Sequence, residues 1–165
     1  RVYVGGLSSG ARLACMIGIS CGDIFSGTLC VCGVNFYLNL PAGGNLYFPS
    51  SFSPAADVLA FARAHAKYVL VTGENDPDSE TIKLVATRGF LREGFKQVLL
   101  LDIPGLQQAL PGLGPLGQAL GFLGETQIPS AVPAAKTPVS SKPRNPHPAA
   151  SPTPDKPPAS AGRAE

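Results

Sequence analysis

Four short apolar segments alternate with helix-forming segments along the chain, and this alternation limits the folds that the chain can adopt. The apolar segments are rich in Val, Leu, Tyr and Thr, which favour β-strands, and lie at residues 1–5, 28–32, 68–72 and 97–101. The last two are almost continuously apolar, which is typical of strands buried on both faces. We predict an α/β domain with a parallel sheet, whose strands lie side by side in chain order between helices on both faces.

Helices are predicted between and after these strands, at residues 11–19, 53–65, 79–93 and 116–123. The first has an almost entirely apolar surface, as expected for a buried helix. The second is expected to begin at Ser53-Pro54, with serine as the N-cap and proline at the first helical position. Residues 34–53 are rich in Asn, Gly, Pro and aromatic residues, and we interpret them as a long, packed loop.

The distribution of proline separates this domain from the rest of the chain. Ten of the 17 prolines lie in residues 126–165, where they alternate with Ala, Ser, Thr and Lys. Such a segment cannot bury enough apolar surface to offset the entropy lost on ordering. We therefore predict a folded domain at residues 1–125 and a disordered tail at residues 126–165. The formal charge of +2 is divided between them as −1 and +3, so no nucleic-acid partner is expected.

Membrane, disulfide and cofactor functions receive little support from the sequence. Residues 2–22 are apolar, but a Gly/Ser cluster and Arg12 interrupt them, so no membrane span is expected and a membrane-associated protein is the least favoured alternative. The four cysteines are interpreted as buried thiols, although a Cys21–Cys30 disulfide stays open. No Walker-type loop, metal-ligand triad or dinucleotide fingerprint occurs, so we expect neither metal nor cofactor.

One pentapeptide carries recognisable chemistry: Gly6-Leu7-Ser8-Ser9-Gly10 has the form G-x-S-x-G and joins the first predicted strand to the first predicted helix. In a nucleophile elbow, the serine occupies a sharp strand-to-helix turn with strained backbone angles, and the glycines keep the turn free of clashes. The turn exposes the Ser8 hydroxyl, and the N–H of Ser9 can stabilise an oxyanion. The motif predicts Ser8 as a nucleophile, and a plain Gly/Ser turn is the alternative.

With this motif, the sequence resembles the α/β-hydrolase superfamily, and within it the esterases similar to polyhydroxybutyrate depolymerases and feruloyl esterases. The resemblance covers about residues 1–124 and rests on VYVGGLSSGAR at 2–12, DIFSG at 23–27, YVLVTGEND at 68–76 and GFKQV at 94–98. It implies the C-terminal half of a hydrolase domain. It also implies a serine-dependent carboxylic ester hydrolase for a small or polymeric ester, with Ser8 as the nucleophile and Asp76 as the acid.

The loop that follows the last predicted strand departs from the pattern of this family. Such a loop carries the catalytic histidine, but here it reads PGLQQALP at residues 104–111, with Gln108 at the position expected for histidine. An amide does not titrate, so Gln108 cannot act as a general base. The chain's two histidines are His65, in a predicted helix, and His147, in the tail, and neither is expected to replace it.

The second departure is that the chain opens at the nucleophile strand. The N-terminal half of such a domain, with its other oxyanion donor, is therefore expected to be missing, and the first strand is expected to be an exposed apolar edge. We expect little or no ester hydrolysis by this chain as it stands. A non-catalytic binding or scaffolding protein derived from the hydrolase fold is the alternative function.

The acid and the replaced base are expected to lie near the serine. Ser8 and Asp76 each come just after a predicted strand, and the carboxyl ends of parallel strands share one edge of a sheet. Gln108 is then expected to lie within reach of Ser8. Asp102 is a second candidate for the acid, and the acidic residues at 74–80 are otherwise interpreted as a solvated loop and helix start.

Overall fold

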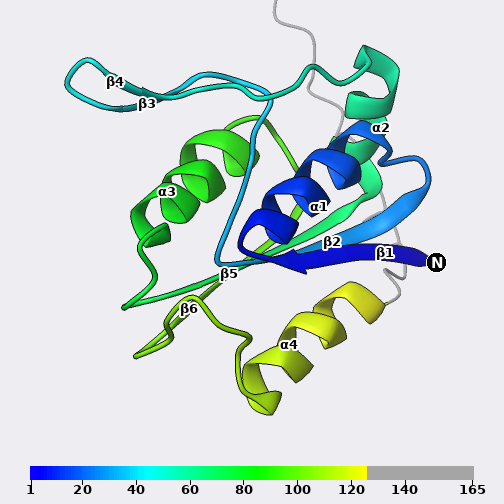
Figure 1. The fold of residues 1–165 in the computed structure, drawn as a ribbon. Coiled ribbons are helices and arrows are strands. Elements are labelled where there is room, and N and C mark those ends of the chain that lie inside the picture. Colours follow the sequence, from blue (N-terminus) through cyan, green and yellow to red (C-terminus); the bar gives the residue numbers. More distant parts are fainter. Residues whose placement is uncertain (126–165) are drawn as a thin grey trace, which may run out of the picture. The chain divides into compact units, whose positions relative to one another are not determined.

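The sheet forms as the apolar segments predict. The computed structural model describes residues 1–125, and the predicted tail lies outside the described residues. The sheet has the order β1-β2-β5-β6, and its three strand pairings are all parallel. Its strands are β1 (Val2–Leu7), β2 (Phe25–Val31), β5 (Lys67–Gly73) and β6 (Gln97–Ile103). The prediction of an α/β arrangement with parallel strands in chain order is confirmed (Figure 1).

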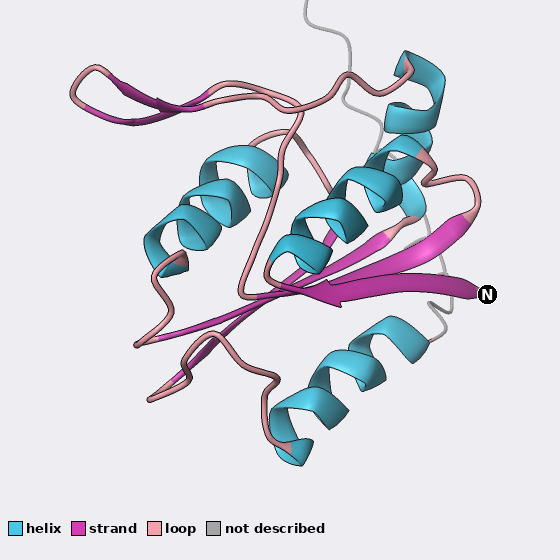
Figure 2. Cartoon of the chain, viewed as in Figure 1, coloured by secondary structure: helices cyan, strands magenta, loops and turns pink. Residues whose placement is uncertain are grey.

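Helices cover both faces of this sheet, in two unequal layers (Figures 1 and 2). One face carries α1 (Ser9–Ser20), α2 (Ala56–His65) and α3 (Ser79–Leu84), which continues into the wider π-helical turn η1 (Val85–Leu91). Within residues 1–125, the other face carries only α4 (Leu113–Gly124). Because helices pack on both sides, the central strands need apolar side chains pointing in both directions.

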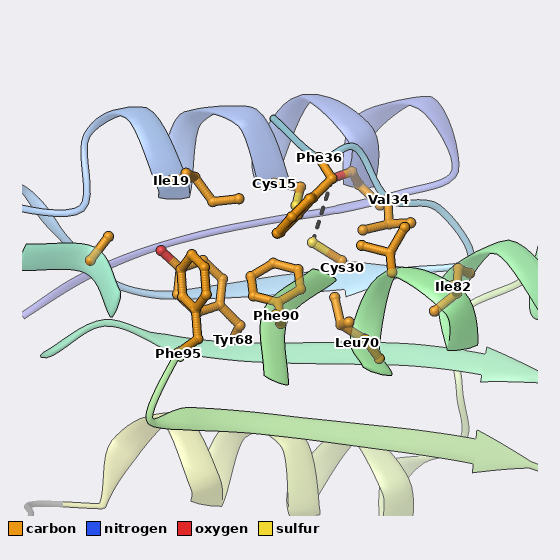
Figure 3. Close-up of a cluster of buried hydrophobic side chains, with 14 of the residues drawn as sticks. Cys15, Ile19, Cys30, Val34, Phe36, Tyr68, Leu70, Ile82, Phe90 and Phe95 are labelled. Atoms are coloured by element: carbon orange, nitrogen blue, oxygen red, sulfur yellow. Dashed lines mark hydrogen bonds between the residues drawn. The ribbon is translucent and has the colours of Figure 1, made fainter. Parts of the chain in front are cut away.

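Strand β5 meets this requirement most completely, because all seven of its residues are buried. Tyr68 and Leu70 enter the core under α1 and α3, together with Phe90 and Phe95 (Figure 3). Val69 and Val71 point to the other face and pack in the smaller core beneath α4. This alternation of side chains between the two faces explains why the strand is apolar without interruption.

The long segment after β2 is more ordered than the sequence predicts. Instead of a loop throughout, it contains an antiparallel hairpin of β3 (Leu40–Gly43) and β4 (Leu46–Phe48). Gly43, the last residue of β3, and Gly44, the next residue, have φ angles of 118° and 54°, which glycine adopts without steric cost. A two-residue turn, Gly44-Asn45, closes the hairpin.

Several element boundaries differ from the prediction by one to three residues, and three of them are informative. Strand β2 begins at Phe25 and ends at Val31, so Cys32 lies just beyond the strand and not within it. Helix α2 begins at Ala56 without a side-chain cap, and the Ser53 hydroxyl makes no capping hydrogen bond. Helix α4 begins at Leu113, three residues earlier than expected. The α2 prediction was wrong because a favourable Ser-Pro pair indicates a helix start without fixing its position.

The cysteines are all free thiols. Cys15, Cys30 and Cys32 are buried, and Cys21 is partly buried, so the Cys21–Cys30 disulfide is not formed. Within residues 1–125, no helix has both the length and the apolar character needed to cross a membrane.

Candidate active site around Ser8

Ser8 occupies a turn with an unusual backbone conformation. It directly follows β1 and precedes the first residue of α1, with φ 55° and ψ −118°. Its N–H still donates to the carbonyl of Val31 at 2.8 Å, while its own carbonyl accepts the first helical hydrogen bond, from the N–H of Arg12. Only glycine enters this region of backbone space freely, and another residue there costs about 1–3 kcal/mol. The chain therefore changes from strand to helix at a single strained residue.

Close backbone contacts surround this turn. A Cβ atom at Gly6 would lie 2.3 Å from the carbonyl carbon of Gly10, and one at Gly33 would lie 2.4 Å from the carbonyl oxygen of Ser8. These neighbours are backbone atoms of α1 and of the turn at Ser8, so they cannot move aside as the end of a flexible side chain could. At Gly10, by contrast, a Cβ would meet nothing within 4 Å among the described residues. The expectation that both motif glycines prevent clashes holds for the Gly6 position and not for Gly10.

Gln108 reaches Ser8 from the loop after β6. Its Nε2 donates a hydrogen bond to Ser8 Oγ at 3.0 Å, although the two residues are 100 positions apart in the chain. The partly exposed Ser8 hydroxyl therefore accepts a hydrogen bond from Gln108. A general base at this position would instead have to accept the proton of the hydroxyl. Ser9 is the first residue of α1, and the N–H groups of a helix's first turn have no acceptor within the helix.

Asp76 follows β5 and is only 4% exposed. Its carboxylate accepts hydrogen bonds from Thr72 Oγ1 at 2.8 Å and from the backbone N–H of Asp78 at 3.1 Å. Asp78 in turn forms an ion pair with Arg12 of α1 at 2.6 Å, which ties the acidic loop to the helix that begins at the elbow. Within residues 1–125, no hydrogen bond joins Asp76 to Ser8 or to Gln108.

The pairing register explains why these residues share one edge of the sheet. Leu7 pairs with Val31, Val31 with Val71, and Val71 with Leu101. Strands β1 and β2 end in this row, and β5 and β6 continue for two more residues, so the carboxyl ends of all four strands lie at the same edge. Ser8 follows the row directly after β1, and Asp76 lies in the loop after β5. The structure thus places Ser8, Asp76 and Gln108 at the same edge, and joins only Ser8 and Gln108 directly.

Cys32 was not predicted as a site residue, and it lies at this edge between Ser8 and Asp76. It follows β2 with a left-handed backbone, φ 51°, and its N–H donates to the carbonyl of Val71 at 2.8 Å. Its thiol donates to the carbonyl oxygen of Gln107 at 3.4 Å. Burial of the thiol, reinforced by the negative charge of Asp76, raises the pKa of Cys32 to about 11.

The other candidate residues lie apart from Ser8. Asp102 forms an ion pair with Lys83 at 2.8 Å, beside a hollow of about 600 Å³ that Asp76 also lines. His65 ends α2 just before β5, which places it at the amino edge of the sheet, opposite to Ser8, where its ring packs on Phe61. His147 lies outside the described residues. In the described part of the chain, no three His, Cys, Asp or Glu side chains converge as metal ligands.

No family model matches this sequence, and no curated protein and no solved structure matches it. The interpretation of the site therefore depends on its own geometry.

Proposed function

We propose that this chain is the nucleophile-bearing part of an α/β-hydrolase domain of the esterase branch, with Ser8 at the position of the nucleophile. In this proposal Ser8 Oγ attacks an ester carbonyl, the Ser9 N–H stabilises the oxyanion, and an acyl-enzyme forms and is hydrolysed. The strained turn at Ser8 and the close approach at Gly6 support it, because these are the features that a nucleophile elbow needs.

The observation that carries the proposal is the hydrogen bond from Gln108 Nε2 to Ser8 Oγ. It supports the interpretation that Gln108 occupies the position from which a base would act on the serine. An amide cannot take the proton that the hydroxyl loses on attack, and general base catalysis contributes about 10²–10⁴-fold to the rate. We therefore expect this site to turn over esters slowly or not at all.

The same hydrogen bond favours a second candidate function, a non-catalytic binding protein derived from the hydrolase fold. An amide and a hydroxyl held together at a partly exposed edge offer both donors and acceptors to a ligand. Such a pair can recognise the carbonyl group of an ester without cleaving it. This candidate predicts ligand binding without any modification of Ser8.

The exposed edge of β1 supports the expectation that further strands complete the domain. Among the described residues, β1 pairs with β2 only, and Val2 and Tyr3 are 53% and 39% exposed. Apolar edge strands without charged side chains are prone to pair with another strand. The proposal is that a further strand pairs with this edge.

The experiment that tests the proposed function is the substitution Gln108→His in the full chain. The Asp76 carboxylate has about four acceptor positions and uses two, so it retains room for an imidazole N–H. Hydrolysis of p-nitrophenyl acetate and labelling of Ser8 by a fluorophosphonate are compared in the wild type, Gln108→His, Gln108→Asn and Ser8→Ala. We expect Gln108→His to raise the Ser8-dependent rate by about 10²-fold, the lower end of the usual range.

The control Gln108→Asn retains an amide and should behave like the wild type. Ser8→Ala should leave the low background rate of the wild type almost unchanged. If the wild type already hydrolyses the ester through Ser8, and Gln108→His gives no gain, the base lies elsewhere and the assignment of Gln108 is wrong. If neither protein is labelled but both bind the ester, the non-catalytic candidate is favoured.

A further inference from the structure

The segment that carries Gln108 has few attachments to the rest of the domain. The earlier part of the same loop is held firmly, because the N–H of Asn75 donates to the carbonyl of Leu106 at 3.1 Å and Glu74 accepts from the N–H of Gly105. Residues 107–110 are all exposed, so their side chains contribute little packing. The position of Gln108 must therefore depend on hydrogen bonds and not on the packing of buried side chains in this segment.

Cys32 supplies an attachment on each side of Gln108. Its Sγ lies 3.4 Å from the carbonyl oxygen of Gln107 and 3.8 Å from that of Ala109. Of these two carbonyls, that of Gln107 is the nearer acceptor for the single proton of the thiol, and the Asp76 carboxylate also interacts with this thiol. Apart from the contact between Gln108 and Ser8, these are the hydrogen bonds that join residues 107–109 to other elements within the described chain.

The backbone around Cys32 suits this task. Its left-handed conformation is uncommon for a residue other than glycine, and such conformations persist where the surrounding structure holds them. Gly33, the next residue, packs its α-carbon against the carbonyl of Ser8. The Cys32-Gly33 pair therefore contacts Ser8 and the two residues that flank Gln108.

We propose that Cys32 is a positioning residue, whose thiol holds the peptide groups flanking Gln108 and thereby keeps the Gln108 amide on Ser8. The raised pKa of the thiol agrees with this role, because the group stays protonated and remains a donor at neutral pH. The inference builds on the proposed function, in which Gln108 faces the nucleophile, but the contact itself is structural. It can therefore be tested whether or not the chain hydrolyses esters.

The test is the side-chain amide signal of Gln108 in ¹H–¹⁵N spectra of the full chain, assigned by its absence from Gln108→Ala. Three variants are compared with the wild type. Cys32→Ala removes the donor, and its Gln108 signal should move to the position of a free glutamine amide. Cys32→Ser restores a donor, and its signal should remain near the wild-type position. Cys30→Ala is the matched control, because that buried thiol donates to Ala11, in the core under α1.

Cys30→Ala removes the same atoms from the same strand region, so a general loss of packing would affect both alanine variants alike. A Gln108 signal that stays in place in Cys32→Ala would overturn the proposal. The proposal would also be overturned if Cys32→Ser folds but its Gln108 amide signal no longer lies near the wild-type position. If Cys32→Ala does not fold, the S–H stretching band of the wild type decides, after assignment by its loss in Cys32→Ser. A band shifted to the frequency of a hydrogen-bonded thiol supports the proposal, and an unshifted band refutes it.

Discussion

Replacement of Ser8 by glycine should stabilise the domain relative to replacement by alanine. Ser8 has φ 55° and ψ −118°, a region that glycine enters freely and alanine does not. Both variants lose the hydrogen bond from Gln108, so that loss cancels between them. The difference in their stability therefore reports the backbone strain at this one position.

The size of the effect follows from two opposing contributions. Relief of strain at such a residue contributes about 1–3 kcal/mol. Glycine also makes the unfolded chain more flexible, which costs about 0.4–1 kcal/mol. The net gain of Ser8→Gly over Ser8→Ala is then about 0.5–2 kcal/mol. For a domain of this size each kcal/mol shifts the melting temperature by about 4 °C, so the expected difference is roughly 2–8 °C.

Urea unfolding and thermal unfolding of the two variants measure this difference. The neighbouring pair Ser9→Gly and Ser9→Ala is the control, because Ser9 is the first residue of α1 and there alanine should be the more stable choice. If glycine gives the more stable protein at position 8 and alanine gives the more stable protein at position 9, the backbone strain lies at Ser8. A Ser8→Gly protein that is no more stable than Ser8→Ala would refute the conclusion that the turn is strained.

Two further predictions concern the surroundings of Ser8. Gly6→Ala should destabilise the domain by about 1–3 kcal/mol or more, because the new Cβ meets the backbone of Gly10. Gly10→Ala should instead stabilise the domain by up to about 1 kcal/mol, because alanine favours a helix more than glycine does. Equal effects of the two substitutions in urea unfolding would contradict this prediction. The second concerns pH. The Cys32 thiol ionises near its usual pKa of 9.0 in the unfolded chain and near 11 when folded, so between these values the unfolded chain binds fewer protons and the free energy of unfolding falls as pH rises. The wild type should therefore lose up to about 2–3 kcal/mol relative to Cys32→Ser between pH 9 and 11, and parallel pH profiles of the two proteins would contradict it.

Much of the fold is predictable because each central strand is buried on both faces. The run from Tyr68 to Val71 has to be apolar at every position, and this pattern is visible without any tertiary information. The sequence does not predict the hairpin of β3 and β4, although the glycine-rich segment Gly43-Gly44-Asn45 lies between apolar residues. Pro41 and the short length of both strands weaken that signal, since proline is unusual in a strand interior.

The candidate site was predictable where a residue follows directly from the end of a strand. This reasoning brings Ser8, Asp76 and Gln108 to one edge, and the motif indicates the turn at Ser8. It does not indicate the contact of Cys32 with Gln107, because that contact depends on the path of a loop with no regular structure. The sequence predicts Cys32 as part of an apolar strand, whereas in the structure it follows the last residue of that strand, Val31. Gly33, which follows Cys32, is the one local feature of the sequence that indicates the end of the strand.

The strand order has a consequence for how the chain folds during synthesis. Because the order in the sheet is the order in the chain, each strand that leaves the ribosome can pair with the one made before it. Among the described strands, none has to be inserted between two that are already paired, and each new strand of the sheet joins the one made just before it, which limits the entropy cost of closure. Of these four strands, β6 is then the last to join, and α4 packs over the face on which Val69 and Val71 lie.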